Sequence, residues 1–143
     1  MPHTLSKDRT LKALVIDETA FVRKAVSKSL AQLGVQNIIE VSDAGAAVRR
    51  LRNEHFDLVI SDSQLPTMTG FELLHYIRNN DRIKHTPFLM LTANLAESQE
   101  MSSLPSIVSD FVSKPFSTED LETKLIRLLS KEINLNRDSS STR

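Results

Sequence analysis

Residues able to bind Mg²⁺ and to handle a phosphoryl group follow four separate apolar runs of the chain. The acids Asp17 and Glu18 follow the first run, Asp62 follows the third, Thr92 ends the fourth, and Lys114 follows the fifth. Clustered carboxylates repel one another unless a cation lies among them. Oxygen ligands of this kind suit Mg²⁺, which takes one or two carboxylates and keeps several waters. We therefore expect a Mg²⁺ site where these chain positions meet.

The same residue types are suited to phosphoryl transfer. A carboxylate held near Mg²⁺ can act as a nucleophile and form an acyl phosphate. The Lys114 ammonium can bind a phosphoryl oxygen, and the Thr92 hydroxyl can donate a hydrogen bond to another. Taken alone, each residue is more often structural, since a single Asp at a strand end is usually a turn or cap residue. Their combination, in this order on four of the five expected strands, favours a phosphoryl site.

Apolar runs and helical periods alternate along the chain and predict the elements that position these residues. Continuous apolar runs suit strands that are covered on both faces of a sheet. The expected strands are 11–17, 37–41, 56–61, 87–91 and 111–113. The expected helices are 22–33, 44–51 with Ser42 or Asp43 as its cap, 71–78, 95–104, and a last one that Ser117 opens.

Five such β/α units predict an α/β fold, a doubly wound five-stranded parallel sheet with helices on both faces. Ligands bind such sheets at the carboxyl ends of the strands, so the polar residues above should share one rim. The polar stretch 1–10 is expected to be an N-terminal tail and 11–132 the folded domain. The stretch 133–143 is expected to be a flexible C-terminal tail or the start of a linker.

Composition excludes several function classes. Lys plus Arg and Asp plus Glu are 18 each in 143 residues, and this zero net charge argues against direct nucleic-acid binding through bulk positive charge. The chain has no cysteine, which excludes disulfides, thiolate metal sites and a Cys nucleophile. No apolar run approaches the roughly 18 residues of a membrane span, and the N-terminus has no signal-peptide pattern. We expect a cytoplasmic protein without membrane insertion.

With these residues at these positions, the chain resembles the receiver domain of two-component response regulators, the single-domain chemotaxis type being closest in size. The resemblance covers about Leu11 to Lys131. It rests on Asp17-Glu18, Asp62, Pro66, Met68, Gly70, Thr92-Ala93 and Lys114-Pro115-Phe116. It implies a flavodoxin-like strand order, 2-1-3-4-5. It also implies a signalling switch that is not an enzyme, apart from its self-catalysed phosphorylation and dephosphorylation.

The resemblance implies a role for each acid. Asp62 would accept a phosphoryl group from a phosphohistidine on a sensor histidine kinase or a phosphotransfer protein. Asp62, Glu18 and the backbone carbonyl of Gln64 would bind Mg²⁺, and Asp17 would help directly or through water. Glu18 is one methylene longer than an aspartate at this position, which could shift the metal slightly.

The resemblance also implies how the phosphoryl group would be held and sensed. Lys114 and the Thr92 hydroxyl would bind phosphoryl oxygens, the Ala93 amide could add a donor, and the Lys114–Pro115 peptide bond would be cis. Thr92 and Phe111 would form the switch, because Phe111 turns inward when Thr92 shifts. The face of the fourth helix, fifth strand and last helix would then bind an unknown downstream protein target or form a homodimer. The segment 102–109 departs from the family pattern.

Two amide side chains bear on the lifetime of the phosphate. Gln64 and Asn94 lie two positions after Asp62 and Thr92. In the family that the chain resembles, the residues at these two positions border the path of the water that hydrolyses the acyl phosphate. Amides can orient a water molecule without a charge that repels it. We expect the acyl phosphate to be lost readily rather than held for hours. Two solvated amides without kinetic effect are the alternative.

Three other functions fit parts of the pattern. A haloacid-dehalogenase-type phosphatase also uses an Asp nucleophile and Mg²⁺, but this chain has Gln64 where such an enzyme carries its general acid. A flavodoxin-like flavin binder is rejected, because Asp17 and Glu18 would repel the flavin phosphate. A receiver-shaped interaction module that is never phosphorylated stays open, although the complete set of acids, Thr92 and Lys114 argues against it.

Overall fold

The structure is a computed structural model that describes residues 10–93 and 110–141, with side chains described as far as residue 130. Its elements are β1 Lys12–Ile16, α1 Ala20–Gln32, β2 Asn37–Val41, α2 Ala44–Asn53, β3 Leu58–Asp62, α3 Gly70–Arg78, β4 Phe88–Thr92, β5 Asp110–Ser113 and α5 Thr118–Ser141. All strands pair in parallel in the order β2-β1-β3-β4-β5, which confirms the expected doubly wound sheet and its strand order. Asn94, the helix expected at 95–104 and the segment 102–109 lie outside the described residues.

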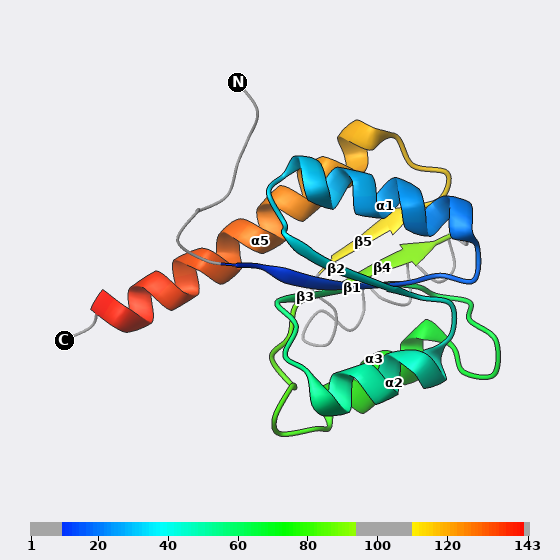
Figure 1. Ribbon diagram of the computed structural model, residues 1–143, viewed down its shortest axis with the longest axis horizontal. Coiled ribbons are helices and arrows are strands. Elements are labelled where there is room, and N and C mark those ends of the chain that lie inside the picture. The colour runs from blue at the N-terminus through cyan, green and yellow to red at the C-terminus, as the bar shows by residue number, and fades with distance from the viewer. Residues whose placement is uncertain (1–9, 94–109, 142–143) are drawn as a thin grey trace.

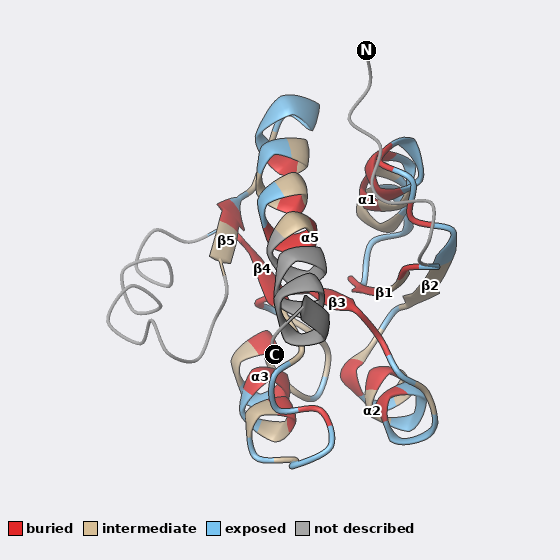
Figure 2. Ribbon diagram, turned by 90° about the vertical axis from the view of Figure 1, so that its left-hand side faces the viewer, coloured by how far each residue is buried: buried red, intermediate tan, exposed pale blue. Residues whose placement is uncertain are grey.

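The strands place alternate side chains in two cores. Helices α1 and α5 cover one face of the sheet, and α2 and α3 cover the other (Figure 1). In β1, Ala13 and Val15 pack with α1 and α5, whereas Leu14 and Ile16 pack with α2 and α3. Figure 2 shows buried residues along the strands and on the sides of the helices that face them. Burial on both faces explains the continuous apolar runs 13–16, 58–60 and 88–91 in β1, β3 and β4.

The helices begin where the local sequence offers caps. Asp43 is the N-cap of α2, and its carboxylate accepts a hydrogen bond from the Ala46 amide at 2.8 Å, as predicted. Thr69 begins α3 through a reciprocal capping box with Glu72. Thr19 is the N-cap of α1, but its side chain makes no capping hydrogen bond. The start of α1 therefore depends on other contacts.

Several element boundaries differ from the sequence expectations, and two of these differences affect Asp62 and the C-terminal stretch. β3 begins at Leu58 rather than at residue 56, and it extends far enough that Asp62 ends the strand. α5 continues to Ser141, so the tail expected over 133–143 is helical for most of its length. No glycine or proline follows Pro115 to end the helix, and its last turns extend beyond the sheet (Figure 1). None of the helices in the described ranges combines the length and apolar character that a membrane span requires.

A close backbone contact fixes the loop that follows Asp62. The buried Gly70 donates its amide hydrogen bond to the Ser63 carbonyl at 2.9 Å. A Cβ atom at Gly70 would lie 2.3 Å from the Asp62 carbonyl oxygen and 2.9 Å from Ser63 Cα. Both neighbours are backbone atoms, so the loop holds this position only with a residue that has no side chain.

We predict that Gly70→Ala lowers the free energy of unfolding by about 1–3 kcal/mol, because the backbone after β3 must move to admit the methyl group. Urea unfolding measures the change. Gly45→Ala is the matched control, since a Cβ at this exposed helical position would meet side-chain atoms alone, Asp43 Oδ1 at 3.3 Å and Arg49 Nη1 at 3.7 Å. We expect this control to stay within about 1 kcal/mol of wild type. Equal unfolding free energies for the two variants would contradict the packing argument.

Candidate functional site

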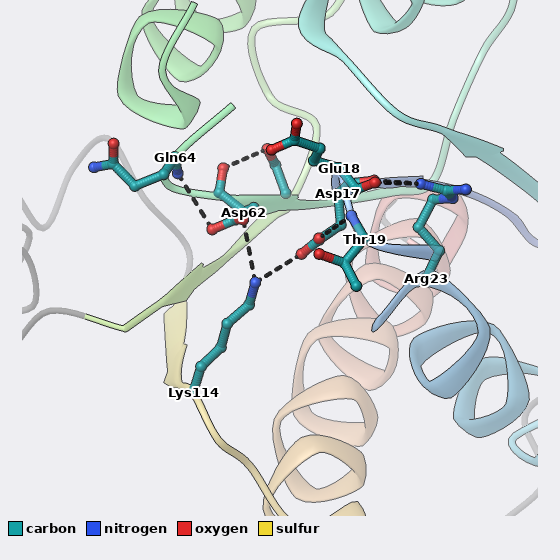
Figure 3. Close-up of polar contacts among 8 residues, drawn as sticks. Asp17, Glu18, Thr19, Arg23, Asp62, Gln64 and Lys114 are labelled. Atoms are coloured by element: carbon teal, nitrogen blue, oxygen red, sulfur yellow. Dashed lines mark hydrogen bonds and ion pairs between the residues drawn. The ribbon is translucent and has the colours of Figure 1, made fainter. Parts of the chain in front are cut away.

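Three charged side chains meet at the carboxyl ends of the strands (Figure 3). Asp17 follows β1, Asp62 ends β3, and Lys114 follows β5. The Lys114 Nζ atom lies 2.8 Å from Asp17 Oδ2 and 3.1 Å from Asp62 Oδ2. Because β1 and β3 are paired neighbours in a parallel sheet, the two carboxylates emerge at the same rim. The ammonium bridges them.

Asp17 is the buried member of this group. Its side chain has 0% exposure, and both of its carboxylate oxygens have partners. Oδ1 accepts a hydrogen bond from the Thr19 amide at 2.8 Å, and Oδ2 accepts one from Lys114. A carboxylate without water is stable only when charge and hydrogen bonds compensate for the lost hydration. Asp17 is therefore a fixed negative charge that holds the lysine.

Asp62 is the accessible member of the group, with 14% of its side chain exposed. Its Oδ1 atom accepts a hydrogen bond from the Gln64 amide at 3.2 Å, and its carbonyl accepts one from the Ser61 hydroxyl at 2.9 Å. The flanking residues Ser61 and Ser63 are buried, so the backbone on either side is held. Of the two aspartates, Asp62 is the one that a reactant from solution can reach.

Lys114 is held by its backbone and by both acids. Its amide donates a hydrogen bond to the Thr92 carbonyl at 2.7 Å, which ties the end of β5 to the end of β4. The Lys114–Pro115 peptide bond is cis, as the resemblance implies. Burial alone would lower the pKa of Lys114, but the hydrogen bond to Asp17 and the charges of Asp62 and Asp17 outweigh burial and raise this pKa above its usual value. Lys114 therefore remains a cation throughout the physiological pH range.

The predicted phosphoryl-binding and switch residues lie along β4 and β5. Thr92 is buried at the end of β4, and Ala93 beside it is exposed. Phe111 is half-buried and stands opposite Met90 in the β4–β5 register. The Lys124 ammonium lies over the Phe111 ring, 5.7 Å from its centre. The two switch residues therefore belong to the same pair of strands.

The oxygen donors at this rim fit Mg²⁺ in kind and in charge. The Asp17 and Asp62 carboxylates share a single ammonium, which leaves net negative charge for a divalent cation. Glu18 is exposed, and its side chain points away from Lys114 (Figure 3). Across the described part of the chain, no three His, Cys, Asp or Glu side chains gather closely enough to hold a metal ion. Binding through all three acids therefore requires the Glu18 side chain to turn.

Arg23 of α1 contributes to the site and was not expected from the sequence. Its Nη1 atom donates hydrogen bonds to the carbonyl oxygens of Asp17, at 2.6 Å, and Glu18, at 3.2 Å. Contacts to backbone carbonyls follow from the loop conformation, and no residue pattern reports them. The only available signal is an arginine in the helix directly after an acidic loop, which is a weak one.

Comparisons with known proteins show the family to which the chain is similar. A family model described as the response regulator receiver domain matches residues 13–126. The chain is 31% identical over 121 residues to the chemotaxis protein CheY of Pseudomonas aeruginosa, an alignment that spans 85% of this chain and 98% of that protein. It is 32% identical over 124 residues to the chemotaxis protein CheY-3 of Vibrio cholerae, spanning 87% of this chain and 95% of that protein.

Solved structures show the same fold. The chemotaxis response regulator CheY4 of Vibrio cholerae aligns with a TM-score of 0.76 at 30% identity, covering 85% of this chain and 100% of that one. The receiver domain of the Francisella response regulator 1452 aligns with a TM-score of 0.74 at 22% identity, covering 85% and 98%. At this lower identity the likeness supports the fold alone.

We predict that Lys114→Met lowers the free energy of unfolding by about 1–3 kcal/mol at pH 7, because the buried Asp17 carboxylate loses its counter-charge. Urea unfolding measures the loss. Lys24→Met is the matched control, because the Lys24 side chain is 75% exposed and pairs with Glu40 only at 3.4 Å. Exposed pairs contribute little, so we expect this control to change stability by less than about 0.5 kcal/mol.

The pH dependence of the Lys114→Met effect has a definite sign. Since the folded-state pKa of Lys114 is raised, its contribution is complete below the unfolded-state pKa of about 10.4 and is lost as pH rises through the folded-state value. The stability difference between the two proteins should therefore hold from neutral pH into the alkaline range and narrow only above it. A variant as stable as wild type at pH 7, or a difference that vanishes near neutrality, contradicts this account.

Proposed function

This chain belongs to the response regulator receiver domain family, and we propose that Asp62 is its phosphoacceptor. A receiver domain of this CheY-like type is a signalling switch. The observation that carries the proposal is the pairing of Asp62 Oδ2 with Lys114 Nζ at 3.1 Å, beside the buried Asp17. The pairing places a fixed cation, able to bind phosphoryl oxygens, next to the more accessible of the two carboxylates.

In the proposed reaction, an Asp62 carboxylate oxygen attacks the phosphorus of a phosphohistidine on a sensor histidine kinase or phosphotransfer protein. The new O–P bond forms as the P–N bond breaks, and the imidazole nitrogen keeps the electron pair. Lys114 transfers its hydrogen bond from Asp62 to a phosphoryl oxygen and keeps its bond to Asp17. The Thr92 hydroxyl and the Ala93 amide donate to the other phosphoryl oxygens.

Asp62, Glu18 and the backbone carbonyl of Gln64 would hold Mg²⁺, with Asp17 binding directly or through water. When bound, the ion neutralises the charge that the phosphoryl oxygens bring to an acidic site. The oxygen donors and the uncompensated negative charge of the paired aspartates support this part of the proposal. The exposure of Glu18 leaves its side chain room to turn toward the other ligands.

Phosphorylation would be sensed through β4 and β5. The Lys114 amide binds the Thr92 carbonyl, and Phe111 stands in register with Met90, so a shift of Thr92 acts on the strand that carries Phe111. Two conformations would exchange, and the phosphate contacts would change their populations. The output would be binding of a downstream protein, or homodimer formation, through β5, α5 and the expected fourth helix. A cytoplasmic location remains a prediction.

We predict that incubation with Mg²⁺ and acetyl phosphate or phosphoramidate adds one phosphoryl group to the wild-type protein, as measured by intact mass. Asp62→Asn should gain none, because its amide lacks the nucleophilic carboxylate. Asp43→Asn is the matched control and should gain the group normally, since Asn caps a helix as well as Asp does. The proposal fails if Asp62→Asn is phosphorylated as fully as wild type, or if folded wild type that binds Mg²⁺ is never phosphorylated.

We predict that Gln64→Lys prolongs the lifetime of the acyl phosphate several-fold. Gln64 is exposed and adjoins the acceptor, so an ammonium there can pair with phosphoryl oxygens and hinder the attacking water. Intact mass, followed over time after removal of the phosphodonor, measures the lifetime. Gln36→Lys makes the same change at an exposed position just before β2 and should leave the lifetime unchanged. Phosphate that lasts longer in wild type than in both Gln64→Lys and Asn94→Arg would rule out this role of the amides.

A further inference from the structure

Arg23 binds the backbone of both acids in the loop between β1 and α1. Its hydrogen bonds to the Asp17 and Glu18 carbonyls come from the single atom Nη1, at 2.6 and 3.2 Å. The Arg23 side chain is only 17% exposed. Figure 3 shows it on the opposite side of Asp17 from Lys114. Arg23 therefore lies beside the acidic site without binding any of the site's carboxylates.

The loop that Arg23 binds has no conventional helix cap. Thr19 is the N-cap residue of α1, yet its side chain accepts no hydrogen bond from the helix, and the first turn has no acidic residue. The Thr19 amide instead donates to Asp17 Oδ1 at 2.8 Å. The loop conformation thus depends on the Asp17 carboxylate and on Arg23, and of these two only Arg23 has no part in the proposed reaction.

Glu40 on β2 holds the other side of the guanidinium. Arg23 Nε lies 3.5 Å from Glu40 Oε1, and Glu40 Oε2 also accepts a hydrogen bond from the Ser27 hydroxyl at 2.8 Å. Because the guanidinium is planar and rigid, a partner at Nε helps to direct Nη1 toward the loop carbonyls. The Glu40 charge also offsets that of Arg23, so the site keeps its net negative charge for a cation.

We propose that Arg23 is a positioning residue for the metal site. By binding the carbonyls of Asp17 and Glu18, it fixes the backbone from which these two acids present their carboxylates to Mg²⁺. The inference rests on the proposed function and extends it to a residue that touches neither the metal nor the phosphoryl group. Removing groups that orient metal ligands typically weakens metal binding by about 10–100-fold.

Titration of the full chain with Mg²⁺ by isothermal titration calorimetry tests this role. Arg23→Gln should raise the Mg²⁺ dissociation constant by about tenfold or more. Lys24→Gln is the matched control, because it removes the same charge from the next residue, which also pairs with Glu40, at 3.4 Å, but is 75% exposed. Within the described residues Lys24 makes no hydrogen bond to the acidic loop, and screening should keep its effect within about twofold.

A second readout separates positioning from a general structural role. At saturating Mg²⁺, Arg23→Gln should be phosphorylated by acetyl phosphate at the wild-type rate, while the Mg²⁺ concentration for half-maximal rate rises with the dissociation constant. Circular dichroism establishes that each variant is folded. Should Arg23→Gln not fold, Glu40→Gln, which keeps the guanidinium but removes its anchor, should also raise the Mg²⁺ dissociation constant relative to Lys24→Gln.

Equal Mg²⁺ dissociation constants for Arg23→Gln and Lys24→Gln would overturn the role of Arg23, whether both are raised or both unchanged. A lower phosphorylation rate at saturating Mg²⁺ with an unchanged dissociation constant would overturn it as well. Absence of Mg²⁺ binding by the wild-type chain would instead overturn the metal site of the proposed function. The two failures are therefore distinguishable in one set of titrations.

Discussion

One lysine ammonium between two aspartates of unequal exposure is the interaction on which the site depends. Lys114 lies 2.8 Å from the fully buried Asp17 and 3.1 Å from the partly exposed Asp62. Two carboxylates this close repel each other without a cation, and Asp17 could not be buried as an anion without a partner. Because Asp17 fixes the ammonium, Lys114 can exchange Asp62 for a phosphoryl oxygen and still stay in place. The Lys114 ammonium thus balances the charge of the two carboxylates and also serves the proposed phosphoryl transfer.

The parallel sheet brings these groups together because the carboxyl ends of its strands lie at one rim. The apolar residues of β1 and β3 are buried on both faces, and Asp17 and Asp62 stand at the carboxyl ends of these two paired strands. β5 brings Lys114 to that rim, and the Lys114 amide bonds to Thr92 so that β4 and β5 end together. Glu40 on β2 pairs with Arg23, and Arg23 in turn binds the acidic loop between β1 and α1. Each of the five strands therefore contributes a contact to the acidic site or to the loop beside it.

Residue patterns predicted the features that depend on burial and periodicity. Apolar runs located all five strands, and Asp43 was correctly expected as a cap of α2. The strand order came from the family resemblance, since periodicity alone does not order a sheet. The carbonyl contacts of Arg23 and the direction of Glu18 depend on loop conformation, which no spacing reports. The helical conformation of 133–141 was not predicted, because a polar composition suits a helix as well as a loose chain.

The most direct test of the central claim identifies the residue that carries phosphorus. Borohydride reduces an aspartyl phosphate to homoserine, and tandem mass spectrometry of the digested protein then locates the reduced residue. The account predicts homoserine at position 62 alone, and only after phosphorylation in the presence of Mg²⁺. Homoserine at the position of Asp17 or another acid, or equal conversion of Asp62 without Mg²⁺, would contradict it.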